Sequence, residues 1–369
     1  LFVCCLSFFS FSQKIEKESL SKLKFTYWDA SKTQIQSKGK YYVDIYGEST
    51  DKHGKWYYFD KLGGMEEVRH YNKGMLSGSV IKYFPNGTKL QEGFFKNNRQ
   101  DSIYTEWFES GKVKMEGFYR KGNPEKKWKY YYRDGSLKIV EEIKAGTNYT
   151  WEFYLQDSLH TQTVIDGNGE LTTYYTIGSV KEWYNYKDGL KNGDFEEISI
   201  YGYLTLKGSF KNGKKDGEWQ YFYYSGEKEK VSHYEDGVLH GAYNYFYDNG
   251  QLNVEGSYKN GKKFGEWKWY TNSGKKDMVG NFNENLQHGE WKYWLPTGEL
   301  SYEAFYKDGL RSGEWIYYYK DGVVFKKGNF DNDLKHGEWK TWYEDETLLM
   351  EGEYKKGKEQ GEWNNYWEN

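Results

Sequence analysis

A ten-residue phrase, Gly-x-Trp-x-x-Tyr-x-x-x-Gly, returns every 24 residues through most of this 369-residue chain. A fixed period of this size is typical of a linear array of small units, each too small to bury a core alone. Contacts in such arrays run mainly between neighbouring units, so copy number sets the length of the chain. The third position of the phrase is filled in consecutive copies by Trp219, Tyr243, Trp267, Trp291, Trp315, Trp339 and Trp363.

Further columns appear when positions are counted from the Gly that opens the phrase. Position 6 is large and apolar, as at Tyr270, and position 18 is aromatic in nearly every copy, as at Tyr258. Positions 10 and 21 carry Gly, Asn or Asp, the residues that tolerate positive φ, and so mark tight turns. Two turns per unit leave two segments of about six residues, which is strand length. We therefore predict an all-β fold, an elongated single antiparallel sheet of stacked two-stranded hairpins.

Two columns make demands on packing. Positions 3 and 6 cannot lie on one face of a regular strand, because side chains alternate. We expect a bulge, a strong twist or coiling of the sheet to reconcile them. Position 16 is often Gly, as at Gly256 and Gly280. A glycine inside a strand marks the close approach of another group, which we expect to be an aromatic ring of the adjacent hairpin.

The period divides the chain into segments. Residues 1–12 are apolar and 13–53 hold a degenerate unit, followed by a first repeat block at 54–149. Residues 150–168 form a shortened, irregular unit, and 169–369 form a second repeat block in which the 24-residue step is kept.

The first residues predict export. The stretch LFVCCLSFFSFS resembles the tail of a secretory signal, and Ser10 and Ser12 are small residues at the sites that a signal peptidase prefers. We expect cleavage before Gln13 and a secreted or periplasmic protein; the alternative is a buried N-terminal strand. Cys4 and Cys5 are the only cysteines, so the mature chain would have no disulfide and no thiolate metal site.

No constellation of catalytic residues stands out, and we expect neither an enzyme nor a bound cofactor or metal. Hydrolase activity from the irregular segment is the alternative from the enzyme class, with Asp157, His160 and Asp166 as its candidate residues. The net charge is only −3 with signs interspersed, so no broad basic field exists to hold nucleic acid. Nucleic acid is therefore not an expected partner.

The segment Tyr258–Gly274, YKNGKKFGEWKWYTNSG, resembles the MORN repeat in its bacterial variant form. That family follows an aromatic-x-x-Gly turn with a second Gly, an aromatic residue and a further Gly turn. The segments 306–322 and 330–342 match as well, and the likeness covers nearly everything after residue 50. It implies a coiled antiparallel sheet of stacked hairpins. Proteins with such repeats are often labelled YwqK-type antitoxins of toxin–antitoxin systems, while other MORN proteins scaffold partners or sit near membranes.

A second likeness is carried by residues 54–65, GKWYYFDKLGGM. This segment is similar to the choline- and glucan-binding repeats of cell-wall proteins, which place ligands between aromatic residues of adjacent hairpins, as cation–π or sugar-stacking recognition requires. The 24-residue spacing and the Tyr-x-x-Gly element favour the MORN variant.

These patterns predict a non-catalytic scaffold of the cell envelope or exterior that binds a protein partner, with the oligomeric state open. The alternatives are an antitoxin and a module that binds an envelope glycan or a membrane surface. The seven position-3 aromatics from Trp219 to Trp363 are the candidate residues, either as packing groups or as an exposed binding stripe.

Overall fold

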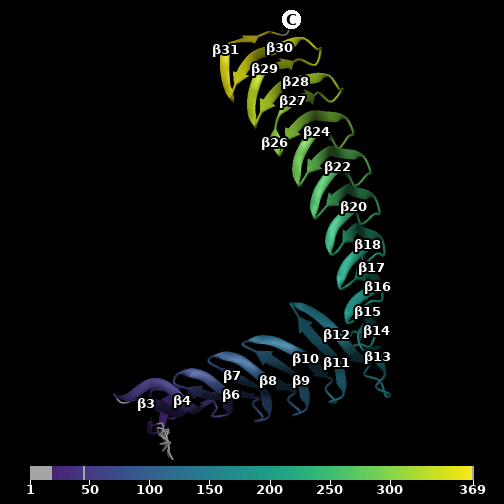
Figure 1. Ribbon diagram of the computed structural model, residues 1–369. Helices are drawn as coiled ribbons and strands as arrows, with labels where there is room; N and C mark the ends of the chain where they lie inside the picture. Colours follow the sequence, from purple (N-terminus) through teal and green to yellow (C-terminus); the bar gives the residue numbers. More distant parts are fainter. Residues whose placement is uncertain (1–18, 45, 368–369) are drawn as a thin grey trace, which may run out of the picture. The chain divides into compact units, whose positions relative to one another are not determined.

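The computed structural model describes residues 19–44 and 46–367, and every regular element in these ranges is a β-strand (Figure 1). The predicted all-β class of antiparallel hairpins is confirmed. Within the described ranges there is consequently no helix with the length and apolar character needed to cross a bilayer. The predicted signal segment at 1–12 lies outside the described residues. The chain divides into two compact units: the first ends at Gly167 and the second begins at Asn168.

The first unit is an open ladder in which each strand from β3 onward pairs antiparallel with the next, while β1 and β2 both pair with β3. Its strands are β1 (Ser19–Leu20), β2 (Lys24–Tyr27), β3 (Ile35–Asp44), β4 (Gly47–Phe59), β5 (Met65–Asn72), β6 (Met75–Tyr83), β7 (Lys89–Lys96), β8 (Arg99–Trp107), β9 (Val113–Arg120), β10 (Asn123–Tyr131), β11 (Leu137–Lys144), β12 (Thr147–Tyr154) and β13 (Gln162–Ile165). The short β13 belongs to the irregular segment that breaks the period.

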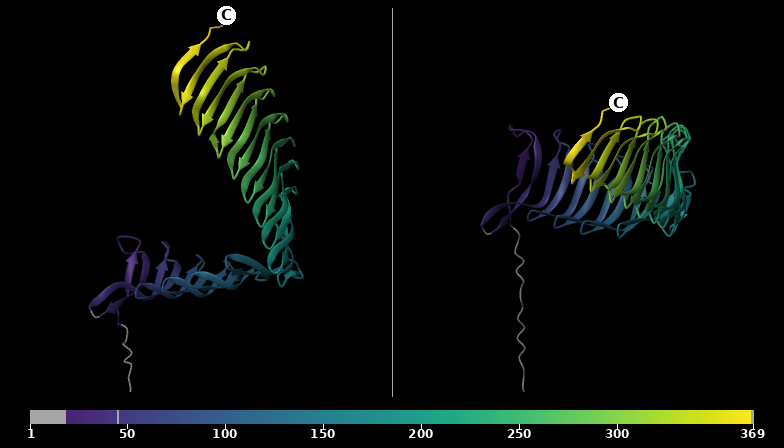
Figure 2. Two further views of the ribbon diagram at one scale, coloured as in Figure 1. Left: turned by 45° about the horizontal axis from the view of Figure 1, so that its top comes forward. Right: turned by 90° about the horizontal axis from the view of Figure 1, so that it is seen from above.

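The second unit repeats the same ladder, and two short strands, β26 and β27, share the pairing with β25. Its strands are β14 (Asn168–Tyr174), β15 (Val180–Lys187), β16 (Leu190–Ile198), β17 (Leu204–Lys211), β18 (Lys214–Phe222), β19 (Lys228–Glu235), β20 (Val238–Phe246), β21 (Leu252–Lys259), β22 (Lys262–Tyr270), β23 (Lys276–Asn283), β24 (Leu286–Trp294), β25 (Leu300–Lys307), β26 (Leu310–Arg311), β27 (Gly313–Tyr318), β28 (Val324–Asp331), β29 (Leu334–Trp342), β30 (Leu348–Lys355) and β31 (Lys358–Asn365). Figure 2 shows that the strands within each unit are curved and lie side by side in chain order.

The two glycine columns form the turns that their residue types predict. Asn260 and Gly261 have φ of 51° and 78°, and two successive residues with positive φ give the type I′ turn whose twist suits a two-residue hairpin. At the other edge, the amide of Gly274 donates to the carbonyl of Thr271 at 2.8 Å, and its φ is 80°. Each turn type therefore defines one edge of the ladder.

Main-chain groups at both edges also bond to the neighbouring repeat. At the position-21 edge the amide of Gly261 donates to the carbonyl of Leu239 in the preceding repeat at 2.8 Å. At the position-10 edge the hydroxyl of Tyr247 (position 7) donates to the carbonyl of Tyr270 in the next repeat at 2.9 Å. The same hydrogen bond to a carbonyl of the next repeat is made by Tyr132, Tyr175, Tyr223, Tyr319 and Tyr343. In the repeats that carry it, the position-7 tyrosine thus links the repeat to its successor.

Positions 3 and 6 lie on opposite faces. The Tyr270 hydroxyl donates to Glu255 at 2.8 Å, and Lys268 lies 3.5 Å from the same carboxylate. Position 6 therefore shares a face with position 4, across the sheet from position 3. A register shift does occur between Trp269 and Tyr270, but the expectation that such a bulge would reconcile the two columns is wrong. Position 6 belongs to a separate row of Tyr, Glu and Lys.

The interior column of glycines receives the position-3 rings, as predicted. A Cβ atom on Gly280 would lie 2.0 Å from Cδ2 of Trp291, and one on Gly256 would lie 2.2 Å from the same atom of Trp267. Both indoles are 1% exposed. Where position 16 is not Gly before a large ring it is often small: Ser232 faces Tyr243, and Ala304 faces Trp315. Where position 16 is Gly, the ring therefore lies against the backbone of the preceding strand.

We expect Gly280→Val to destabilise the second unit by about 1–3 kcal/mol, the usual cost of overpacking a filled core. The new methyl groups would occupy the space of the Trp291 indole. The measurement is urea unfolding followed by tryptophan fluorescence. The control is Ser232→Ala, a change at the same position 16 that removes one buried oxygen and adds no volume, so it should cost less than Gly280→Val. Equal unfolding midpoints for Gly280→Val and the unmodified chain would contradict this packing.

Candidate functional site

The predicted candidate residues lie mostly in the core. Of the seven predicted position-3 aromatics, the five that are at most 5% exposed are Trp219, Trp267, Trp291, Trp315 and Trp339. Tyr243 and Trp363 are half-buried. Rings that are covered by protein cannot stack on a ligand, so this column is explained by packing.

The position-3 tryptophans of the second unit each pack edge-to-face on the position-18 ring of the preceding repeat. The centroids of Tyr258 and Trp267 lie 5.2 Å apart at 87°, and the same geometry recurs between Phe330 and Trp339 at 5.2 Å and 88°. Such pairs contribute about 0.5–1.5 kcal/mol each beyond their buried area. The indole N–H of Trp267 is also satisfied, since it donates to the carbonyl of Ser257 at 3.2 Å.

Lysine side chains lie over some of these rings. The ammonium of Lys263 lies 4.5 Å from the centroid of Trp267 and 4.9 Å from that of Phe282, and Lys215 lies 4.0 Å from Trp219. Burial lowers the pKa of Lys263. A choline-type ligand would need the ring faces that these lysines occupy. The chain thus supplies its own cations to its aromatic rows.

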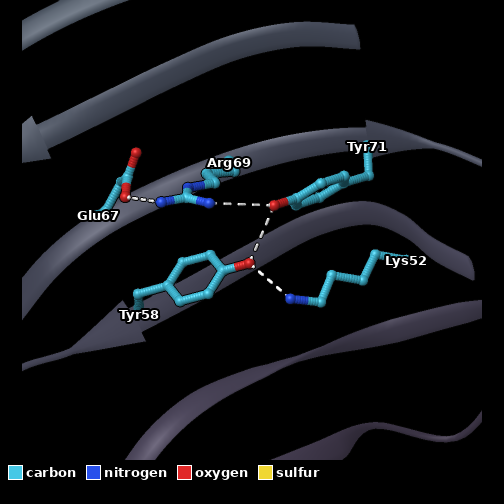
Figure 3. Close-up of polar contacts among 5 residues, drawn as sticks. All are labelled: Lys52, Tyr58, Glu67, Arg69 and Tyr71. Carbon is cyan, nitrogen blue, oxygen red and sulfur yellow. Dashed lines mark hydrogen bonds and ion pairs between the residues drawn. The ribbon is translucent and has the colours of Figure 1, made fainter. Parts of the chain in front are cut away.

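The first repeat replaces part of this pattern by a chain of polar groups (Figure 3). Lys52 donates to the Tyr58 hydroxyl at 2.9 Å, which lies 3.1 Å from the Tyr71 hydroxyl. Arg69 donates to Tyr71 at 3.4 Å and to the buried Glu67 at 2.6 Å. Burial, followed by the hydrogen bond with Tyr58, raises the pKa of Tyr71. Because each of these groups bonds to the next, the row of polar side chains links β4 to β5.

Arg69 is the residue that sequence reasoning missed here. It stands at position 16, where later repeats have Gly, and its register partner on β6 is Val80 instead of a large ring. The guanidinium carbon lies 4.7 Å from the centroid of Tyr58. The paired departure, Arg for Gly and Val for Trp, was the available signal.

The hydrolase candidates in the irregular segment have local roles. One oxygen of Asp157 accepts the amide of Thr161 at 2.9 Å, and the other accepts its hydroxyl at 2.7 Å. The His160 ring stacks on Tyr154 with a centroid distance of 4.8 Å, while Asp166 lies in the turn after β13. In the described ranges, no group of three or more His, Cys, Asp and Glu residues has the geometry to hold a metal.

Aliphatic side chains are exposed along the position-21 edge of the second unit. Leu286, Leu310 and Leu334 stand at position 22 in consecutive repeats and are 49%, 42% and 47% exposed. Leu286 lies 3.4 Å from the place of a Cβ on Gly309, the turn glycine of the next repeat. We call these three residues the leucine row. Sequence reasoning missed it, although position 22 is readable as a column.

The pKa values of tyrosines on these faces predict a loss of stability at high pH. Burial is the main cause that raises the pKa of Tyr243 and of Tyr318 to about 12. The fold favours the neutral phenol, so these tyrosines stabilise the folded chain against the unfolded one. Tyrosines of the unfolded chain ionise near pH 10, so this stabilisation is complete below about pH 10 and is lost towards pH 12. We expect urea midpoints to fall across this window, and Tyr243→Phe to fall less.

The control for this measurement is Tyr201→Phe, because Tyr201 is 78% exposed. Its midpoints should follow those of the unmodified chain at each pH. A pH dependence of Tyr243→Phe that matched the control would show that Tyr243 contributes nothing to it.

Comparison with known families gives one repeated match, described as the MORN repeat variant. The matched segments are 76–97, 100–121, 239–260, 287–308, 311–332 and 335–356. All of them begin at position 23, so they share the 24-residue register of the hairpins. No curated protein matches the chain.

Solved structures similar to this chain include the TcdB2–TccC3 complex, with 10% identity and a TM-score of 0.17 over 93% of this chain. They also include TcdB2–TccC3–TEV (10%, TM-score 0.19, 90% of this chain) and a Photorhabdus luminescens Tc holotoxin pore with mutant TccC3 (10%, TM-score 0.19, 86%). The chain spans only 21%, 24% and 23% of the lengths of those chains, and such low TM-scores carry no argument. The family match, in register with the observed hairpins, shows that this chain is a MORN-repeat variant protein.

Proposed function

We propose that this chain is a non-catalytic scaffold that binds other proteins, and that the leucine row is a contact surface. The observation that carries the proposal is the exposure of Leu286, Leu310 and Leu334 in three successive repeats. Two strands per repeat space them about 9.6 Å apart, so they form a continuous aliphatic strip. Exposed apolar side chains that gather in this way mark protein-interaction sites.

The repeat itself does not require leucine at this position. Lys214, Lys262 and Lys358 stand at position 22 in other copies of the second unit, at the starts of β18, β22 and β31. A lysine there is compatible with the same type I′ turn and the same strand pairing. The leucine row is therefore better explained by a partner than by the stability of the ladder.

We further propose that the protein acts in the cell envelope or outside the cell, on the basis of the apolar segment 1–12 and the small residues at Ser10 and Ser12. Fractionation of cells that express the full-length gene tests this address. Recovery from the periplasm or medium is expected. A protein found only in the cytoplasm would contradict the proposal and favour the antitoxin alternative.

The contact surface is tested with the triple variant Leu286→Lys, Leu310→Lys and Leu334→Lys in a pull-down from envelope extract. The introduced side chains already occur at the equivalent position of other repeats, so the variant should fold. We expect bound partners to fall at least about tenfold, because three apolar contacts of an interface are replaced by charges.

The matched control carries three lysines in place of exposed aliphatic residues elsewhere, Leu62, Leu159 and Ile177, which are 97%, 84% and 70% exposed. It makes the same change in charge and should retain its partners. Equal recovery with the leucine-row variant and the unmodified chain would rule out this surface.

A further inference from the structure

A cavity of about 750 Å³ lies in the first unit, at the position-21 edge. Its lining residues belong to two turns of successive repeats and to the strands beside them. These are the β7–β8 turn and the β9–β10 turn, and the four strands are labelled in Figure 1. The first turn contributes Lys96 and Arg99, the second contributes Arg120 and Lys121, and Phe118 of β9 adds an apolar wall. We call this the basic cavity.

The charges in the basic cavity are poorly compensated. Its lining contains one carboxylate, Asp101, which accepts the main-chain amide of Lys121 at 3.4 Å. Arg120 is paired with Glu125 at 3.2 Å. Among the ion pairs of the described residues, none involves Lys96, Arg99 or the Lys121 side chain, and all three residues are exposed. An excess of positive charge therefore faces the space between the turns.

The second unit has cavities at the same edge, and in each of them an ion pair within the lining offsets part of the positive charge. In a cavity of about 710 Å³, Arg311 pairs with Asp333 at 3.1 Å. In a smaller one of about 360 Å³, Lys262 pairs with Glu284 at 3.0 Å. Glu284 stands at position 20 of its turn and Asp333 at position 21. In the turns that line the basic cavity, position 20 is Asn97 in one and Lys121 in the other, so neither supplies a carboxylate there. The basic cavity is lined by four cations and one carboxylate, whereas these two cavities are lined by three cations with two carboxylates and three cations with one. The basic cavity therefore has the largest excess of positive charge of the three.

We propose that the basic cavity binds an acidic polypeptide segment in extended conformation. Its volume lies within the range of clefts that enclose ligands of many atoms, far larger than one small anion. The cations form two tiers one repeat apart, about 9.6 Å. In a polyproline II segment, carboxylates three residues apart lie on one side at about 9.3 Å, which matches the tiers.

Phe118 gives such a segment an apolar contact between the two charged tiers. The Lys126 ammonium also lies 3.9 Å from the centroid of this ring. Nucleic acid is disfavoured by the net charge of −3 and the interspersed signs of the whole chain. This site is independent of the leucine row, which lies in the other unit.

The test uses the full-length chain and a labelled peptide with glutamate at every third position and proline or alanine between, followed by fluorescence anisotropy. The variant is Lys96→Asn, Arg99→Leu and Lys121→Asn, which introduces residues that other repeats carry at the same positions. We expect saturable binding that weakens with added salt and is about tenfold weaker in the variant, because each exposed charge contact contributes modestly.

The matched control is Lys355→Asn, Lys356→Asn and Lys358→Leu, the same three positions and the same charge change in the last repeat. It should bind within about twofold of the unmodified chain. If circular dichroism shows that the triple variant is unfolded, Arg99→Leu alone should still weaken binding about threefold.

Three results would overturn the proposal: no saturable binding of the glutamate peptide, an equal loss in the matched control, or equal binding of a glutamine version of the peptide. Displacement of the peptide by inorganic phosphate at the concentration of the peptide would identify a small-anion site instead. Equally tight binding of a single-stranded DNA oligonucleotide would assign the cavity to nucleic acid. Full retention of peptide binding when the leucine row is changed to lysine keeps this inference separate from the proposed function.

Discussion

The contact of an indole ring with a glycine backbone is the interaction on which the ladder depends. A sheet without a second layer has no opposing core, so its large side chains must be buried by neighbouring repeats. The Trp291 ring lies on Gly280 and packs edge-to-face on Phe282 at 5.1 Å, both on the preceding strand. Since any Cβ at that glycine would overlap the ring, the two positions must change together. The rule is not absolute: Ala304 at position 16 is buried in one cluster with Trp315, and Tyr184 at the same position stacks on Phe195 at 5.0 Å.

The period allowed much of this architecture to be predicted, because glycine has few other reasons to recur at a fixed place inside a strand. The turns and the ring over Gly280 both followed from residue type. The face of position 6 did not, since alternation alone could not reveal that Tyr270 bonds to Glu255. Tyr247 at position 7 was also missed, because its hydroxyl bonds to a main-chain carbonyl, and any residue type supplies that acceptor.

The candidate site was harder to predict for a related reason. Aromatic columns signal both cores and binding surfaces, and only the burial of Trp267 and its cover by Lys263 separate the two. Since these rings are buried between repeats, a partner can contact only the positions that do not take part in this packing. Position 22 is leucine in Leu310 and lysine in Lys262, without any change in the turn that precedes it. The same ladder of strands can thus have side chains of different chemistry along its edge, aliphatic in one unit and basic in the other.

The most direct test of the packing between repeats is hydrogen–deuterium exchange of a Trp291→Ala variant, read peptide by peptide by mass spectrometry. Stability in such arrays is close to a sum of neighbour terms, and loss of one large core side chain costs about 3–5 kcal/mol. Protection should fall in β23, β24 and β25, which surround the ring, and persist in β15 to β18. Unchanged exchange in β23 to β25, or an equal loss along the whole unit, would contradict an account in which rings join each repeat to its neighbour.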